Sequence, residues 1–104
     1  MNLIDILKEI KDENLTREAL ERYDKHLTAL YSEYMLRNAE LEKEEGFFYD
    51  RMKEQHPEMS DIAITRKWRV SDEGIEFRRK EREIKVINKN LSSIKSRIYQ
   101  TPNY

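Results

Sequence analysis

The stretch EQHPEMSDIAI, residues 54–64, decides how this chain folds. Because a proline disfavours helical geometry in the residue before it, Pro57 ends any helix that reaches His56. Ser60 is a favourable N-cap, and Asp61 places a carboxylate in the first turn of the helix that follows. One helix therefore ends and another begins within a few residues, and the chain is predicted to fold back on itself here.

Both sides of this bend carry apolar residues with the spacing of an α-helix. Alternating steps of three and four residues place side chains on one face, as in coiled coils. Thr16 is the expected N-cap of the first helix, predicted over residues 16–55, and the second is predicted over residues 60–99. The two apolar seams are Leu20, Tyr23, Leu27, Leu30, Tyr34, Leu41, Phe48 and Met52 before the bend, and Ala63, Val70, Phe77, Ile84, Ile87, Leu91, Ile94 and Ile98 after it.

Two glycines interrupt these seams. A glycine inside a helix costs about 1 kcal/mol relative to alanine. The first seam resumes after Gly46, so that helix is predicted to continue through it. The sequence SDEG over residues 71–74 leaves two interpretations: a break with a new N-cap at Ser71, or a continuous helix through Gly74. A kink or break near residues 71–74 is the favoured one.

The N-terminal residues predict a short helix over residues 2–11. Its apolar side chains fall on one face, and they are predicted to dock either near the open end of the hairpin or on a second copy of the chain. They are therefore candidate interface residues. The four are Leu3, Ile6, Leu7 and Ile10.

Together these elements predict an all-α protein that forms a single helical domain over residues 1–104. It consists of a short N-terminal helix and an antiparallel, coiled-coil-like hairpin of two long helices. A homodimer of such hairpins would form a four-helix bundle and cover the seams best. Residues 101–104 are predicted to be a frayed tail.

The two halves of the chain carry opposite charge. Residues 1–64 hold nine Lys and Arg against sixteen Asp and Glu, a balance of −7. Residues 65–104 hold eleven against five, a balance of +6, which leaves the whole chain at −1. An acidic arm and a basic arm are what a folded-back hairpin can pair.

Composition sets further limits. Charged residues make up 39% of the 104 residues, with only two Gly and two Pro, which favours long helices. The lack of cysteine excludes disulfides and thiolate metal sites. No apolar run approaches the roughly 20 residues of a membrane span, and the N-terminus lacks the basic region of a signal peptide. We expect a cytoplasmic protein (in the host cytoplasm if it is viral) without membrane contact or cofactor.

Polar residues occupy some positions in both seams. Folding the hairpin about residues 58–59 places Arg37 near Lys80 and Glu44 near Glu73. Like charges that face each other inside a seam are unfavourable. Either the register is shifted, or the middle of the hairpin is open to water or to a partner.

A basic stripe follows the bend. Steps of four, three and four residues put several cations of the second arm on one helix face, and a second cluster surrounds Trp68. Cations that neutralise phosphates beside a ring that stacks on a base form a nucleic-acid footprint. The alternative is a solvated face, with Glu76–Lys80 and Glu81–Lys85 pairs within the helix. The candidate nucleic-acid residues are Arg66, Lys67, Trp68, Arg69, Arg78, Arg82, Lys85 and Lys89.

The acidic arm offers a third kind of surface. A dense set of carboxylates can imitate a phosphate backbone and block an enzyme that binds nucleic acid. The alternative is again a solvated helix face. The carboxylates lie at Glu40, Glu42, Glu44, Glu45 and Asp50.

Aromatic residues cluster on both sides of the bend. Phe47, Phe48 and Tyr49 are consecutive, so they point in different directions from a helix and cannot all enter one seam. Trp68 is not expected to be fully buried by two helices. Either these rings pack across the tip of the hairpin, or they form a partner surface. Phe47, Tyr49 and Trp68 are candidate interface residues.

The sequence offers little for catalysis. His26 and His56 are 30 residues apart, and no metal-binding histidine motif is present. No nucleophile motif or glycine-rich phosphate loop occurs, and a thin hairpin lacks a deep pocket that excludes water. We therefore predict no metal site, no catalytic residue and no enzymatic activity.

The layout over residues 16–98 resembles a class of small phage-encoded helical-hairpin accessory proteins. These have a long helix rich in Glu and aromatics, a short Ser-capped segment and a basic helix. The connecting segment here is MSDIA at residues 59–63 with Trp68, and the basic helix ends in LSSIKSRI at residues 91–98. The resemblance implies an accessory or inhibitory role and carries over no residue roles.

The leading prediction is a non-enzymatic interaction or accessory protein, phage or mobile-element encoded, that acts by protein–protein contact or self-assembly. Its partner would be itself or a host or viral protein, and no small-molecule substrate is expected. One alternative is a nucleic-acid-binding accessory factor that uses the basic helix. Another is an inhibitor of a nucleic-acid-processing host enzyme that uses the acidic arm.

Overall fold

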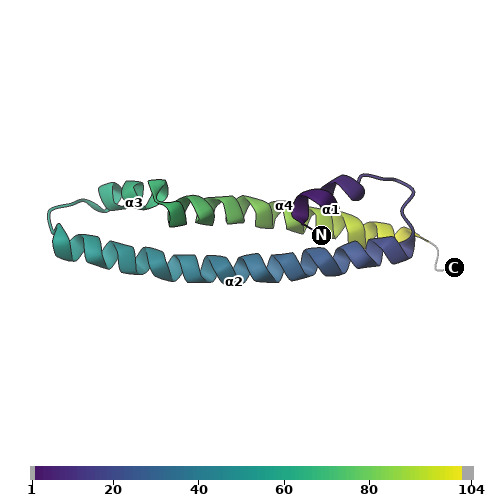
Figure 1. Cartoon of the computed structure of the whole chain (residues 1–104), viewed down its shortest axis with the longest axis horizontal. Coiled ribbons are helices and arrows are strands. Elements are labelled where there is room, and N and C mark those ends of the chain that lie inside the picture. The colour runs from purple at the N-terminus through teal and green to yellow at the C-terminus, as the bar shows by residue number, and fades with distance from the viewer. Residues whose placement is uncertain (1, 102–104) are drawn as a thin grey trace. The chain divides into compact units, whose positions relative to one another are not determined.

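The computed structural model describes residues 2–101, and every regular element in this range is a helix. The four helices are α1 (Leu3–Glu9), α2 (Arg17–Gln55), α3 (Asp61–Val70) and α4 (Asp72–Gln100), shown in Figure 1. The predicted all-α class is confirmed. None of these helices combines the length and the apolar character needed to cross a lipid bilayer. Positions 102–104 of the predicted tail lie outside the described residues.

Packing between the helices divides the chain into two compact units. Unit 1 comprises the described residues of Met1–Glu33 and Ile84–Tyr104, which are α1, the start of α2 and the end of α4. Unit 2 is Tyr34–Glu83, which holds the rest of α2, all of α3 and the start of α4. Within each unit α2 and α4 run in opposite directions (Figure 1), as the predicted hairpin of two long helices requires.

Unit 1 has the regular core that the seams predicted. Steps of three and four residues on both long helices bring aliphatic side chains together, because such steps keep them on one face. Ile6 of α1 completes this core and is 0% exposed within a single copy. α1 therefore docks at the open end of its own hairpin. The other buried residues of this core are Ile10, Ala19, Leu20, Tyr23, Leu27, Ile87, Leu91 and Ile94.

Hydrogen bonds at both ends hold α1 in place. The Asn2 side chain accepts a hydrogen bond from the Asp5 backbone N–H at 2.9 Å, as an N-cap does. After the helix ends, the Arg97 guanidinium of α4 donates to the carbonyls of Ile10 at 2.6 Å and Asp12 at 2.5 Å. A cation at carbonyls left without helical partners is favourable. α1 is shorter than the predicted 2–11 because the chain turns at Ile10.

A tyrosine ties α1 to α2 in the same unit. Hydrogen bonding to the Glu9 carboxylate, aided by burial, raises the pKa of the Tyr23 hydroxyl. The ring itself belongs to the core, with 6% of its surface exposed. The polar tip of a buried tyrosine needs such a partner, since an unpaired hydroxyl in the core is costly.

α2 is continuous through Gly46, as predicted. Thr16 caps its first turn, where the hydroxyl accepts from the Ala19 N–H at 3.1 Å. The helix ends at Gln55, directly before the His56–Pro57 pair. Ser60 then caps α3 by accepting from the Ala63 N–H, also at 3.1 Å.

A single serine separates α3 from α4. The Ser71 hydroxyl donates to the Trp68 carbonyl at 2.5 Å and accepts from the Gly74 N–H at 3.1 Å. It closes the last turn of α3 and opens the first turn of α4 at once. The predicted break near residues 71–74 therefore lies at Ser71.

This break changes which residues face α2. The sequence seam ran through Ala63 and Val70, but Val70 is 75% exposed, so this part of the seam prediction was wrong. Ile64 and Trp68 are the buried residues of α3. The heptad of α4 does not extend into α3, because non-helical backbone at Ser71 resets the helical phase.

Candidate protein-interaction surface

The tip of unit 2 is built around one pair of aromatic rings. Phe48 of α2 and Trp68 of α3 lie with ring centroids 5.6 Å apart and planes tilted by 53°, an arrangement that aromatic pairs favour. Trp68 is 5% exposed, so the expectation that two helices would leave it partly open was wrong. Phe48 covers it from α2, and the first turn of α4 packs on its carbonyl at Gly74.

Polar contacts fasten α3 to α2 beside these rings. The Tyr49 hydroxyl donates to the Asp61 carboxylate at 2.5 Å, and Lys53 Nζ lies 3.2 Å from the same oxygen. Lys53 also donates to the Met59 carbonyl at 2.9 Å. Hydrogen bonds from Tyr49, then from Lys53, lower the pKa of Asp61. Tyr49, a candidate interface residue, is thus occupied within the chain.

Two grooves flank the Phe48–Trp68 pair. The first, of about 400 Å³, we call the acidic groove, because its charged residues are all carboxylates; it is lined by Glu42, Glu45, Gly46, Phe48, Tyr49, Asp50, Ile64, Thr65 and Trp68. The second, of about 770 Å³, is lined by Glu44, Phe47, Phe48, Asp50, Arg51, Glu54, Trp68, Ser71 and Glu73. Apolar rings rimmed by charge are what a protein partner can recognise.

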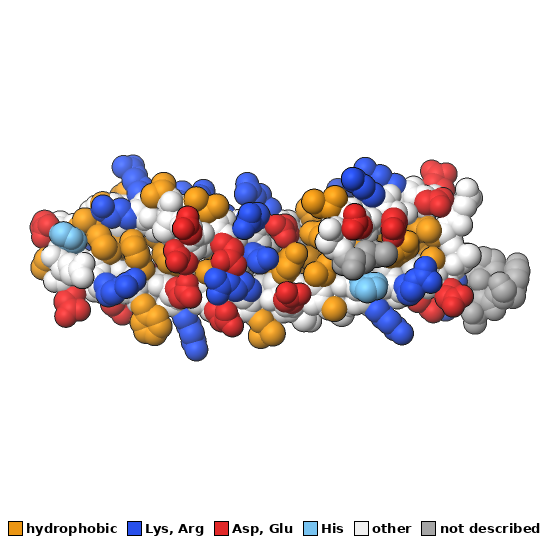
Figure 2. Space-filling model, in the orientation of Figure 1, with side chains coloured by type: hydrophobic (Ala, Val, Ile, Leu, Met, Phe, Trp, Pro, Cys, Tyr) orange, Lys and Arg blue, Asp and Glu red, His pale blue; other side chains and the backbone are white. Residues whose placement is uncertain are grey.

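Large apolar side chains remain at the surface of unit 2. Phe47, a candidate interface residue, is 66% exposed and lines the second groove. On the face of unit 2 seen in Figure 2, hydrophobic side chains lie among charged ones. Contiguous exposed apolar patches rimmed by polar residues mark interaction sites. The exposed large apolar residues of unit 2 are Met35, Leu36, Phe47, Ile62, Val70 and Ile75.

The N-terminal candidates do not belong to this surface. Ile6 and Ile10 are buried within their own chain, and Leu3 and Leu7 are half-buried, so this set is a docking face for the hairpin and not a free interface. The reason is that α1 packs against α2 and α4 in the core of unit 1. Sequence periodicity finds an apolar face but does not say what covers it.

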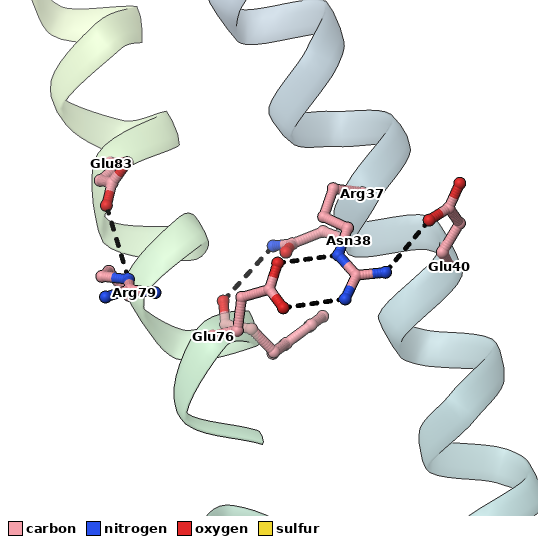
Figure 3. Close-up of polar contacts among 7 residues, drawn as sticks. Arg37, Asn38, Glu40, Glu76, Arg79 and Glu83 are labelled. Atoms are coloured by element: carbon pink, nitrogen blue, oxygen red, sulfur yellow. Dashed lines mark hydrogen bonds and ion pairs between the residues drawn. The ribbon is translucent and has the colours of Figure 1, made fainter. Parts of the chain in front are cut away.

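The polar middle of the hairpin is paired, with a shifted register. Arg37 donates to both carboxylate oxygens of Glu76, at 2.7 and 2.8 Å, and to Glu40 at 3.2 Å (Figure 3). The hydrogen bond from Arg37 lowers the pKa of Glu76. Lys80, expected opposite Arg37, instead lies 3.9 Å from the centroid of the Tyr34 ring. Arg37 and Lys80 therefore do not face each other, and of the two alternatives the shifted register is the one observed.

The other seam carboxylates are not forced together either. Glu44 and Glu73 are both exposed and line the second groove. The buried polar residue is Asn38, next to Arg37, with 8% exposure. Its Nδ2 donates to the Phe77 carbonyl at 3.5 Å, while its buried Oδ1 has no partner among the described residues (Figure 3). The sequence pattern placed Arg37 in the seam and missed Asn38.

The basic candidates are exposed, except the tryptophan. Arg66, Lys67 and Arg69 on α3 and Arg82 on α4 are exposed and form no ion pair within residues 2–101. Arg78 donates to the Arg69 carbonyl at 2.7 Å, at the end of α3. Buried Trp68 is not a free stacking platform, which removes one part of the predicted nucleic-acid footprint.

The remaining basic candidates, Lys85 and Lys89, are exposed residues of unit 1, so the predicted stripe is divided between the units. The expected pairs within α4 do not form among the described residues. Glu76 binds Arg37 instead of Lys80, and no ion pair joins Glu81 to Lys85. Most cations of this arm are therefore not neutralised by their own helix.

Residues 2–101 bring together no group of three or more side chains that could hold a metal ion. No protein-family model, curated protein or solved structure matches this chain.

Proposed function

We propose that this chain is a non-enzymatic interaction protein that binds another protein chain through unit 2. The observation that carries the proposal is the exposure of large apolar side chains on unit 2: Phe47 lines a groove beside the Phe48–Trp68 pair, and Ile62 and Val70 are exposed on α3. An accessory role of this kind is also what the resemblance to small phage-encoded proteins implies.

The physical reason is the cost of hydration. Each large apolar side chain left in water forgoes about 1.5–3 kcal/mol that burial would supply. Ring pairs that are already packed need no reordering when a partner arrives, so little conformational entropy is lost on binding. Paired Arg37, Glu76, Tyr49 and Asp61 hold the helices of unit 2 in place beneath this surface.

Site-specific photo-crosslinking in the cells that make the protein tests this proposal. A photoreactive phenylalanine at Phe47 is expected to give a discrete adduct with a second polypeptide. The same probe at exposed Lys25 of unit 1 is the matched control and is expected to give none. The adduct mass distinguishes a second copy from another protein, and the absence of an adduct from 47, 62 and 70 alike would rule the surface out.

A second candidate function is nucleic-acid binding by α3. It is favoured by the adjacent cations Arg66, Lys67 and Arg69, which are exposed and outside the ion pairs of residues 2–101. If these three residues bind phosphates, the logarithm of the binding constant should fall with the logarithm of the salt concentration with a slope of roughly three, because each phosphate contact releases a counterion. Titration of labelled RNA and DNA at two salt concentrations measures it, and no binding at low salt ends this candidacy.

A further inference from the structure

The ion pairs that join the helices of unit 2 use the minority charge of each arm. Arg37 lies on the acidic arm and pairs with Glu76 of the basic arm, and Lys53 of the acidic arm pairs with Asp61 of α3. The expected pattern was the reverse, with surplus acid facing surplus base. The surplus charges near the tip, which are the carboxylates of the acidic groove and the cations of α3, form no ion pair within residues 2–101 and lie at the surface.

On α3 this surplus is basic and accompanied by apolar side chains. Ile62, Arg66, Arg69 and Val70 are all exposed, and their spacing places them on one face, opposite the buried Ile64 and Trp68. We call these four residues the outer face of α3. With Asp61 paired to Lys53, the charges left on α3 are Arg66, Lys67 and Arg69, all positive.

On the other arm the surplus is acidic, and it lines the acidic groove. Glu42, Glu45 and Asp50 are exposed around the floor made by Phe48, Ile64 and Trp68. Three carboxylates line this groove and no cation does. The groove and the outer face of α3 thus match in charge and each offers apolar surface, but they point away from each other within one copy.

Gly46 adds a steric argument for an occupant. Glycine inside a helix costs about 1 kcal/mol relative to alanine, so a mid-helix glycine calls for a compensating contact. At Gly74 that contact is internal, since an added Cβ would lie 2.0 Å from the Trp68 carbonyl oxygen. At Gly46, which lines the acidic groove, an added Cβ would meet nothing within 4 Å. No close contact within residues 2–101 requires a glycine there.

We infer that the acidic groove of one copy takes the outer face of α3 of a second copy. This inference rests on the proposed function and names the partner chemistry: Ile62 and Val70 against the aromatic floor, Arg66 and Arg69 against Glu42 and Glu45. The missing side chain at Gly46 admits the incoming helix.

Each copy carries both halves of this contact in unit 2. A two-fold dimer is isologous, so the same patch serves on both subunits and every contact is made twice. Two copies of the groove and two of the outer face would then be covered together.

Sedimentation velocity with charge-reversal variants tests the inference. The wild-type chain is expected to sediment as a dimer, and Glu42→Lys/Glu45→Lys or Arg66→Glu/Arg69→Glu to raise the dimer dissociation constant by roughly tenfold or more. Mixing the two variants in equal amounts is expected to restore a dimer that contains one copy of each. In this mixed dimer the reversed groove faces the reversed outer face, and the unchanged groove faces the unchanged outer face, so both contacts join opposite charges. Far-UV circular dichroism confirms that both variants remain helical.

Two further variants separate the effect of occupying the groove from the effect of a changed net charge. Gly46→Leu fills the groove at a position with open space around it, so it should leave the helix intact and weaken the dimer. Glu13→Lys/Glu33→Lys makes the same change in net charge at exposed positions of unit 1 and should leave the dimer unchanged.

A wild-type chain that sediments as a monomer at every concentration would overturn the inference. So would a dimer that is indifferent to Gly46→Leu and to both charge reversals, or variants that fail to recombine. None of these outcomes touches the proposed function, because a crosslink from Phe47 to a different protein would still support it. A wild-type dimer that is lost on charge reversal, without a crosslink to a different protein, would support both proposals and identify a second copy as the partner of unit 2.

Discussion

Single residues in this chain have roles that depend on what lies within a few ångströms of them. The two glycines both sit in helices of unit 2, yet one is exposed and the other buried. Gly74 lets the first turn of α4 approach the end of α3, and Gly46 faces open space. The same residue type is therefore required at one position and dispensable for folding at the other.

Alanine at the two glycines is expected to act in opposite directions. Gly46→Ala should raise the free energy of unfolding by about 0.5–1 kcal/mol, because alanine loses less backbone entropy and meets no neighbour. Gly74→Ala should lower it by about 1–3 kcal/mol, because the added methyl group collides with the Trp68 carbonyl. Urea unfolding followed by circular dichroism measures both. A stabilising Gly74→Ala would contradict the close approach.

At the scale of the elements, the boundaries matter more than the interiors. Ser71 serves two helices, and α1 is too short to be stable without the rest of unit 1. Its docking depends on Ile6 in the core and on Arg97 at the carbonyls that follow the helix. The α3–α4 junction and the docking of α1 are therefore both sensitive to substitutions of one or two side chains.

Removal of the Ser71 hydroxyl is expected to weaken the α3–α4 junction. Ser71→Ala should cost about 1 kcal/mol, typical of a lost N-cap, with a further effect on Trp68, whose carbonyl keeps the backbone N–H of residue 71 as a donor but loses the hydroxyl. The fluorescence of Trp68, the only tryptophan in the chain, reports the change during urea unfolding. Ser92→Ala, an exposed site within α4, is the control and should be neutral or slightly stabilising.

Truncation of Ile6 is expected to release α1. Ile6→Ala should cost about 2–4 kcal/mol, because it leaves a cavity in the core of unit 1. Hydrogen exchange should then quicken in α1 before it does so in α2 or α4, since the short helix undocks locally. Ile4→Ala, at an exposed position on the same helix, should change neither quantity by a comparable amount.

For the whole molecule, the charge pattern governs how stability depends on pH. The hydrogen bond from Arg37 holds the pKa of Glu76 below its ordinary value of 4.5, and that from Tyr49 holds the pKa of Asp61 below 3.8. A carboxyl with a lowered folded-state pKa stabilises the fold above its ordinary pKa, and this contribution disappears as the pH falls through the folded-state value. The protein should therefore lose stability in acid.

The Glu76→Gln variant makes that expectation specific. At neutral pH it should be less stable than the wild type, because the carboxylate partner of Arg37 is gone. As the pH falls below 4.5, the difference between the two proteins should shrink towards zero, since wild-type Glu76 becomes protonated. Urea midpoints across this range test it. Glu81→Gln, exposed and outside the ion pairs of residues 2–101, should show no such convergence.

The helices and their caps follow from the amino-acid sequence alone. Thr16, Ser60 and Ser71 act as the N-cap rule predicts, and Pro57 follows the end of α2. The core of unit 1 follows from the sequence as well, because heptad spacing there continues without interruption on both arms. These are local properties, decided by backbone geometry and by residues three or four positions apart.

Which side chains the helices present to one another and to solvent depends on how they pack in three dimensions. The helical phase of α4 does not continue into α3, because the backbone at Ser71 is not helical. The residue spacing within α4 therefore could not reveal that Val70 is exposed and Trp68 is buried. The pairing of Arg37 with Glu76 depends on the register between α2 and α4, and a shift of a few residues would give each side chain a different partner. The candidate surface of unit 2 depends on that register, because it pairs Arg37 with Glu76 and leaves the carboxylates of the acidic groove and the cations of α3 exposed.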